Sequence, residues 1–317
     1  MNPGAGRPAC AHGPSSAWGR TLAAALALAG AAAAQAGSLR YCDVPVDLDA
    51  AQKDRLLQVA AVVRRVLDST DARIALVSRS GLDLDRFGVR YSHAGLSVRE
   101  GLDTPWAVRQ LYYACDDRRP RVFDQGLAAF VLGLNDPAHG HVAAVLLPAA
   151  AAGALEPVLL ERRRALQVLG STYSANAYPY SVRYQNCNQW VAEMLALAWG
   201  RLDAEVPPEA ARAQAQQWLG EQDYRPSVFE VRFPPVRWLG RFVPFVHHDD
   251  HPVADLDGQR VQVSMPAALD AFVRAQAPQA RRIEVCHAGQ RIVVRRGWSP
   301  IEPGCLPGPD DEVLAID

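Results

Sequence analysis

The chain has 317 residues, of which 49% are hydrophobic and 21% are charged, and this globular balance excludes a collagen-like, coiled-coil or wholly disordered protein. Its 33 Lys and Arg residues nearly balance its 34 Asp and Glu residues. Without a dense basic tract, a nucleic-acid-binding role has no electrostatic support. Lys53 is the only lysine, which excludes a P-loop and most lysine-based catalysis.

The first 36 residues have the features of an export signal. Arg7 and Arg20 make the start positive, and no acidic residue precedes Asp43. The apolar run over residues 22–34 is followed at once by an A-x-A site that ends at Ala36. An uncleaved anchor is the alternative, although the run is short for a membrane span. Cleavage there predicts an exported protein, periplasmic or secreted, with no transmembrane anchor.

The hydrophobic spacing predicts an α+β fold. Period-2 patterns indicate strands over residues 73–77, 91–98, 106–113 and 141–147. Helical spacing indicates helices over residues 48–68, 150–169, 187–199, 208–219 and 267–275, and a hairpin is expected over 283–295. We divide the chain into a signal peptide (1–36), a main domain (37–222) and a C-terminal extension tied by a disulfide (223–317).

Five cysteines remain once the signal is removed. An odd number in an oxidising compartment leaves one thiol or one intermolecular disulfide. Cys286 and Cys305 lie close together in the tail and form a natural pair, and Cys42 and Cys115 could form a second. If both of these disulfides form, Cys187 is left as the thiol. Other pairings stay open, because four cysteines permit three connectivities.

Cys187 stands at the start of the expected 187–199 helix. Asn186 is suited to cap this helix, and Gln189, three residues later, completes a capping-box pattern. A thiol in the first turn faces unsatisfied N–H groups and the positive end of the helix dipole. Both favour the thiolate, and the same N–H groups can stabilise an oxyanion. The alternative is a small buried hydrophobic residue.

A nucleophilic cysteine needs a base, and His93 is the histidine best placed within a strand. Strand alternation puts Tyr91, His93 and Gly95 on one face, and the apolar residues between them toward the core. Gly95 leaves room for a neighbouring element to approach closely. A structural or exposed histidine is the alternative.

Two segments resemble motifs of one enzyme superfamily. Tyr91 to Leu96 (YSHAGL) resembles the His-strand motif of the NlpC-type, papain-like cysteine enzymes, and Asn186 to Val191 (NCNQWV) resembles their Asn-Cys helix start. The order, His before Cys, is similar to the circularly permuted branch that includes lecithin retinol acyltransferase-like proteins. The resemblance spans about residues 70–200. It implies a permuted papain-like core, in which an antiparallel sheet packs against the Cys-bearing helix.

The same resemblance implies a third polar residue on the strand after the His strand, and Gln110 is the candidate. A His or an acid is commoner there, and a neutral Gln orients an imidazole but stabilises an imidazolium less. The implied chemistry is covalent and needs no cofactor: His93 activates Cys187, which attacks an amide or ester carbonyl. Tyr91, Tyr184 and Asn186 are candidate oxyanion or substrate contacts.

The expected partner is a cell-envelope peptide or acyl substrate. A non-catalytic peptide- or lipid-binding protein that keeps the fold is the alternative function. Over nearly its whole mature length the chain also resembles an uncharacterised family of exported bacterial proteins, domain of unknown function 2145. This second resemblance supports the boundaries but supplies no substrate.

Two histidine-containing segments could bind a metal. The run His247 to His251 (HHDDH) holds metal-capable side chains, but ligands this close in sequence rarely converge on one ion, so a solvated turn is favoured over a zinc or copper site. His139-Gly140-His141 is similarly expected to be a loop and strand start. The sequence therefore predicts no metal site.

Overall fold

A computed structural model describes residues 48–82, 84, 87–114, 117–231 and 245–316. The expected export signal and the expected Cys42–Cys115 disulfide lie outside the described residues. Within the described part of the chain, no helix has both the length and the apolar character needed to cross a membrane.

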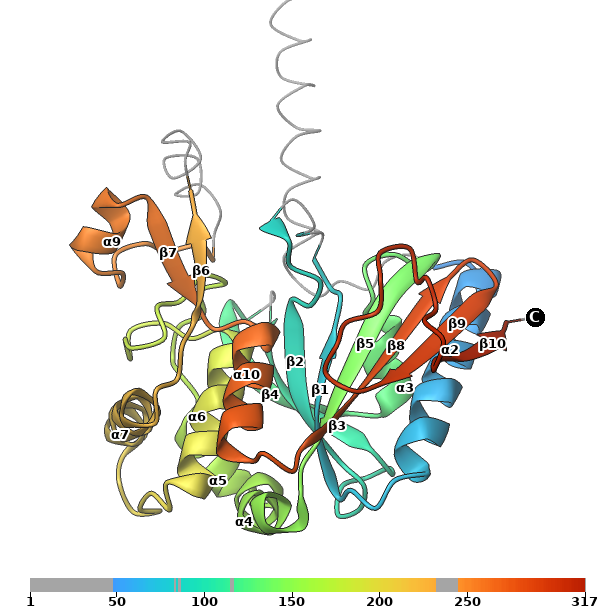
Figure 1. Ribbon diagram of the computed structural model, residues 1–317. Coiled ribbons are helices and arrows are strands. Elements are labelled where there is room, and N and C mark those ends of the chain that lie inside the picture. The colour runs from blue at the N-terminus through green and yellow to red at the C-terminus, as the bar shows by residue number, and fades with distance from the viewer. Residues whose placement is uncertain (1–47, 83, 85–86, 115–116, 232–244, 317) are drawn as a thin grey trace, which may run out of the picture. The chain divides into compact units, whose positions relative to one another are not determined.

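Eight strands of the described residues form one antiparallel sheet, in the order β10-β9-β8-β5-β1-β2-β3-β4 (Figure 1). In chain order they are β1 (Ile74–Arg79), β2 (His93–Val98), β3 (Ala107–Ala114), β4 (Arg119–Gln125), β5 (His139–Leu146), β8 (Arg281–Ala288), β9 (Arg291–Arg296) and β10 (Glu312–Ala315). A separate pair is formed by β6 (Ser227–Glu230) and β7 (Arg260–Val263). Since β8 pairs with β5, residues 223–317 supply strands to the main sheet.

Helices cover both faces of this sheet. The core on one face includes α4 (Ala149–Leu160), α5 (Arg162–Gln167), α6 (Cys187–Trp199), α7 (Pro208–Glu221) and α10 (Pro266–Gln276). The core on the other face includes α2 (Ala50–Asp68) and α3 (Leu127–Leu132). A short helix, α9 (Val253–Asp257), lies between β6 and β7 in the chain. The α+β class is confirmed, and the antiparallel sheet packs against the helix that begins at Cys187.

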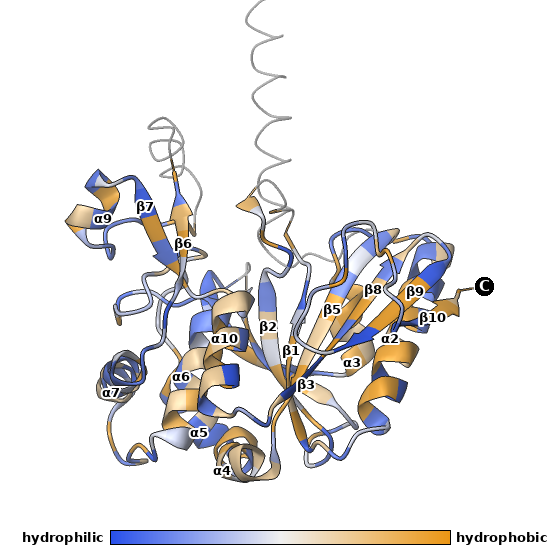
Figure 2. Ribbon diagram, in the orientation of Figure 1, coloured by the Kyte–Doolittle hydropathy of each residue, from blue (hydrophilic) through white to orange (hydrophobic). Residues whose placement is uncertain are grey.

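The helices form because their apolar residues recur at helical spacing. In α2 the buried positions include Leu56, Val59 and Val63, and hydrophobic and hydrophilic residues alternate along α2 and α10 (Figure 2). Asp49 starts α2 with a complete capping box, in which Gln52 binds back to the cap. The expected 150–169 helix is divided instead into α4 and α5, because the backbone at Glu161 is extended.

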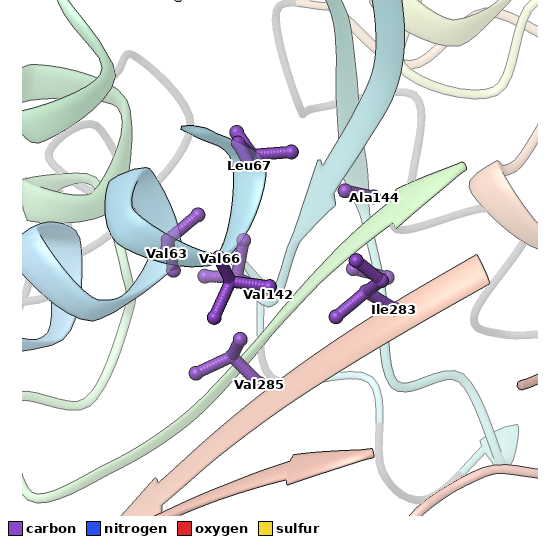
Figure 3. A pocket seen from close by; sticks show the side chains of 8 residues that line it. Val63, Val66, Leu67, Val142, Ala144, Ile283 and Val285 are labelled. Carbon is purple, nitrogen blue, oxygen red and sulfur yellow. The ribbon is translucent and has the colours of Figure 1, made fainter. Parts of the chain in front are cut away.

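A small apolar cavity lies between α2 and the sheet (Figure 3). Its volume is about 10 Å³, far below the roughly 300 Å³ of the smallest ordinary ligand pockets. The lining residues are Val63, Val66, Leu67, Val142, Ala143, Ala144, Ile283 and Val285. This cavity is a packing gap in the core, not a substrate site.

Candidate functional site

Cys187 is the first residue of α6, is only 7% exposed and carries a thiol. The side-chain oxygen of Asn186 accepts a hydrogen bond from the backbone N–H of Gln189 at 2.7 Å, which confirms the expected N-cap. The rest of the expected capping box is wrong. The Gln189 amide donates instead to Glu193 at 3.2 Å and to the carbonyl of Pro179 at 3.3 Å.

The first turn of α6 is bonded to the start of β2. The side-chain amide of Asn188 donates to the carbonyl of Ser92 and to that of Ser264, both at 3.1 Å. Ser92 is the residue before His93. These bonds therefore bring the Cys187 end of α6 to the His93 end of β2.

A buried ion pair fixes the loop that leads to Cys187. Arg212 Nε donates to Glu193 at 2.9 Å, and both side chains are buried. Gln185 Nε2 donates to the same carboxylate at 2.6 Å, and Arg212 also donates to the carbonyl of Tyr184 at 2.9 Å. The network joins α6, α7 and the two residues before the N-cap, so it sets the position of the helix start.

His93 meets its expected partner. Its Nε2 lies 2.6 Å from Gln110 Oε1, and its ring stacks on Tyr112 with a centroid distance of 5.0 Å. Gly95 makes this approach of β3 feasible, because a Cβ atom there would lie 3.1 Å from the Cβ of Gln110. The ring of Phe130, in α3, lies 6.1 Å from that of His93. The imidazole is thus held on the sheet face that α3 covers.

Cys187 belongs to the core on the other face. Ala94, Leu96 and Val98 pack in that core with α6, and alternation along β2 turns His93 away from it. The structure therefore brings Cys187 and His93 to the same end of β2, while their side chains belong to opposite faces of the strand.

Tyr91 lies apart from His93. Its hydroxyl donates to Glu284 at 2.7 Å, and its ring faces His141 at a centroid distance of 6.3 Å. The expectation that Tyr91 and His93 share a face is wrong, because β2 begins at His93 and strand alternation does not extend to Tyr91. Burial raises the pKa of Tyr91 well above its ordinary value. The Tyr91 hydroxyl is thus bound to a buried carboxylate.

Tyr184 stacks on His247 with a centroid distance of 4.4 Å. Residues 247–251 form a turn, as expected, but it is not solvated: the side chains of Asp250 and His251 are buried, and the turn anchors the loop before α6. The amide of Asn176 donates to the carbonyl of His247 at 2.7 Å, and His251 Nε2 lies 2.8 Å from the carbonyl oxygen of Asn176. The histidine run therefore has a clear structural role next to Tyr184.

Sequence reasoning missed Arg79, at the end of β1. Its guanidinium is buried, donates to the carbonyl of Gly133 and to the Tyr112 hydroxyl, and lies over the ring of Phe130. Gly133 leaves the necessary room, since a Cβ there would lie 2.6 Å from Arg79 Cζ. The one signal in the sequence is a charged residue shortly after the apolar run of β1. Arg79 and the half-buried Tyr112 extend the His93 pair into a polar cluster.

Comparison with known protein families gives one match. Residues 66–273 match the model of DUF2145, described as an uncharacterized protein conserved in bacteria. The chain belongs to this family. The DUF2145 match includes both motif segments and ends before β8. No curated protein and no solved structure matches the chain.

The expected Cys286–Cys305 disulfide is confirmed and joins β8 to the loop after β9. Its presence is compatible with an exported protein, since disulfides persist in oxidising compartments. Both cysteines lie beyond the part of the chain that matches DUF2145.

Proposed function

We propose that the protein is an exported thiol hydrolase or acyl transferase with a permuted papain-like core. Cys187 is the nucleophile, His93 the base and Gln110 the residue that orients the imidazole. The observation that carries the proposal is the 2.6 Å contact between His93 and Gln110, on a strand whose preceding residue is bonded to the first turn of α6.

The reaction follows from these roles. His93 takes the proton of the Cys187 thiol, and the thiolate attacks the carbonyl carbon of an amide or ester. The first N–H groups of α6 have no intrahelical acceptor and stabilise the resulting oxyanion. The leaving amine or alcohol takes the proton from His93, which leaves a thioester on Cys187. Attack by water on the thioester, or by a second acceptor nucleophile, releases the acyl group and restores the thiol.

The substrate proposed is a peptide or acyl group of the cell envelope. Support for it comes from the export signal in the sequence and from the motif resemblance. Asn186 and Tyr184 flank the nucleophile in sequence and are the proposed contacts with this substrate. Tyr91 is no longer among them, since its hydroxyl binds Glu284.

A second candidate function is a non-catalytic binding protein that keeps the fold. It is favoured by the opposite faces of β2 on which Cys187 and His93 lie, and by the low exposure of the thiol. In this case the His93–Gln110 pair serves as a buried structural hydrogen bond, and a peptide or lipid is the ligand.

The pH dependence of alkylation at Cys187 distinguishes the enzyme from the non-catalytic binding protein. The mature, oxidised protein is treated with iodoacetamide, and the Cys187 peptide is quantified by mass spectrometry in wild type, His93→Ala, Gln110→Ala and the control His139→Ala. The enzyme proposal expects reaction well below the ordinary thiol pKa of about 8.5, lost in His93→Ala and kept in His139→Ala. If the Cys187 thiol is inert, or equally reactive in His93→Ala, the enzyme proposal is wrong and the binding-protein proposal is favoured.

A further inference from the structure

Four metal-capable side chains converge where β5 pairs with β8. They are His139, His141, Cys286 and Cys305, and their ligand atoms all lie within 4.8 Å of one another. His141, Cys286 and Cys305 are buried, and His139 is half-buried. This cluster was not expected, because the two cysteines stand far from the histidines in sequence.

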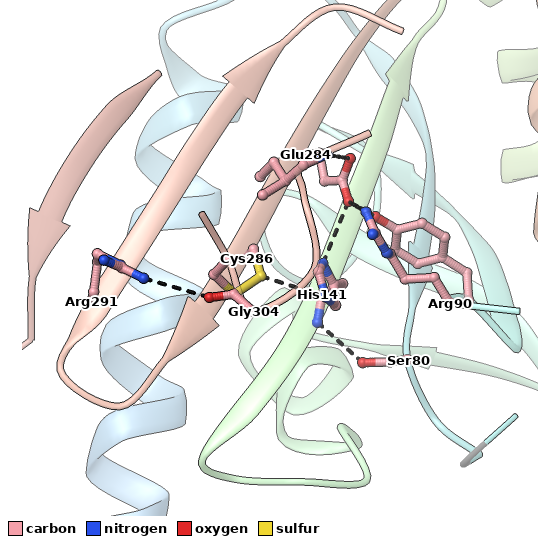
Figure 4. Close-up of a disulfide and its surroundings, with 10 residues drawn as sticks. Ser80, Arg90, His141, Glu284, Cys286, Arg291 and Gly304 are labelled. Atoms are coloured by element: carbon pink, nitrogen blue, oxygen red, sulfur yellow. Dashed lines mark hydrogen bonds and ion pairs between the residues drawn. A yellow bond between two sulfur atoms is a disulfide. The ribbon is translucent and has the colours of Figure 1, made fainter. Parts of the chain in front are cut away.

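The sheet register assembles the cluster. His141 in β5 is directly opposite Cys286 in β8, and His139 lies two residues earlier on the same face of β5. Cys305 arrives from the loop after β9, where the backbone at Gly304 and Cys305 has positive φ angles of 73° and 54°. Arg291 donates to the carbonyl of Gly304 at 3.5 Å and helps to place this loop (Figure 4).

The donor set is that of a tetrahedral site with two sulfur and two nitrogen ligands, which selects zinc among the common divalent cations. Tetrahedral geometry with Zn–N bonds of about 2.0 Å and Zn–S bonds of about 2.3 Å puts neighbouring N and S ligands about 3.5 Å apart. His141 Nε2 lies 3.5 Å from Cys286 Sγ. One edge of the tetrahedron therefore already has the required length.

A buried carboxylate lies beside the central histidine. Glu284 Oε1 lies 3.4 Å from His141 Nδ1, on the side of the ring away from Cys286 (Figure 4). Arg282 and Tyr91 hold this buried carboxylate at 2.9 and 2.7 Å. Metal-binding histidines are commonly supported by a carboxylate at the ring nitrogen that does not bind the metal. Glu284 stands at ion-pair distance from that nitrogen, which has no hydrogen bond among the described residues.

We propose that the dithiol form of this cluster binds one zinc-class divalent cation through His139, His141, Cys286 and Cys305, and that the Cys286–Cys305 disulfide is its oxidised, metal-free form. A dithiol reductant supplies two electrons and two protons to the disulfide and itself becomes a disulfide. Cation binding then displaces the two thiol protons. Oxidation by a disulfide donor removes two electrons from the thiolates, re-forms the bond and releases the cation.

Cobalt(II) is the probe. Mature protein in a Cys42→Ser, Cys115→Ser, Cys187→Ser background is titrated with Co²⁺, both oxidised and after reduction. The expected result is one Co²⁺ per reduced chain, with sulfur-to-metal charge-transfer bands and the visible bands of a tetrahedral site, and displacement by Zn²⁺. The oxidised protein should show neither set of bands. A reduced protein without these bands overturns the proposal.

Histidine variants keep the test specific. His139→Gln replaces a half-buried ligand and should weaken Co²⁺ binding at least about tenfold, while the oxidised variant keeps its disulfide and its circular dichroism spectrum. His247→Gln, a half-buried histidine elsewhere, should bind Co²⁺ as the parent does. Equal binding by His139→Gln and the parent overturns the assignment. Neither Cys187 nor His93 takes part, so this site is independent of the proposed enzyme.

Discussion

Nε2 of His93 lies 2.6 Å from the side-chain oxygen of Gln110, on the neighbouring strand. The ladder between β2 and β3 reaches only as far as Leu96 and Arg109, so the two side chains meet where the strands are no longer paired by backbone bonds. Gly95 permits the close approach of the strands at this point. A buried hydrogen bond therefore replaces the backbone ladder at this end of β2.

The contribution of this hydrogen bond can be measured with a double-mutant cycle. We expect His93→Phe and Gln110→Leu each to lower the free energy of unfolding by about 1–3 kcal/mol, because each leaves a buried polar partner unsatisfied. The double variant should lose less than the sum, with a coupling energy of about 0.5–1.5 kcal/mol from urea denaturation. A coupling energy near zero would contradict the contact.

The Arg212–Glu193 ion pair should matter far more than an exposed pair of the same type. Arg212→Met leaves the buried carboxylate of Glu193 uncompensated, and we expect a loss of about 3–5 kcal/mol. The matched control is Arg163→Met, which removes the exposed Arg163–Glu205 pair and should cost less than about 1 kcal/mol. Similar losses in the two variants would show that the buried network does not hold the helix start.

Local patterns in the sequence predict much of the fold. The apolar spacing indicates α2, α6, β1, β3, β5 and the β8–β9 hairpin, because each buries a regular face. β4 is missed, since its charged residues and Pro120 resemble a loop. The structure places β4 at the sheet edge, where a proline is tolerated. The pairing of β5 with β8 joins segments far apart in sequence, which periodicity does not encode.

The candidate site is likewise predictable from the sequence only where its contacts join residues close together in the chain. The Asn186 cap is predictable because it depends on neighbours in sequence. The Gln189 half of the capping box fails: Gln189 Nε2 donates to the buried carboxylate of Glu193, and Oε1, the acceptor that the box needs, has no partner among the described residues. The contact of Tyr91 with Glu284 spans 193 positions and depends on a strand order that no local pattern supplies.

The Asn186 cap should contribute measurably to stability. Asn186→Ala removes the acceptor for the Gln189 N–H, and we expect a loss of about 1–2 kcal/mol in thermal or urea unfolding. Asn186→Asp keeps an acceptor at the same position and should be more stable than Asn186→Ala. If Asn186→Asp is instead the less stable variant, the bonds that the Asn186 amide donates to Ala175 and Ser264 contribute more to stability than the cap does.

Asp270, in α10, should make stability depend on pH. Burial raises its pKa to about 6, against the opposing effect of Arg282, whose Nε lies 3.3 Å from Asp270 Oδ2. An unfolded Asp titrates near 3.9, so the folded protein binds this proton more tightly than the unfolded chain does. The stabilisation from the proton is therefore complete below about pH 4 and is lost as pH rises through about 6.

Comparison with Asp270→Asn isolates this effect, since Asn stays neutral and keeps nearly the same shape. Burial raises the pKa of Glu284, but His141, Arg282 and Tyr91 lower it, and the net pKa in the folded protein is below the ordinary value. The stability that the Glu284 carboxylate contributes is therefore lost only as pH falls below about 4.3, the pKa of an unfolded Glu. Glu284 is present in both proteins, and its contribution cancels in the difference. We expect the free energy of unfolding of wild type, relative to Asp270→Asn, to fall by on the order of 1–3 kcal/mol between pH 4 and pH 6.5. Urea denaturation across this range measures the difference, and a constant difference would place the pKa of Asp270 near its ordinary value.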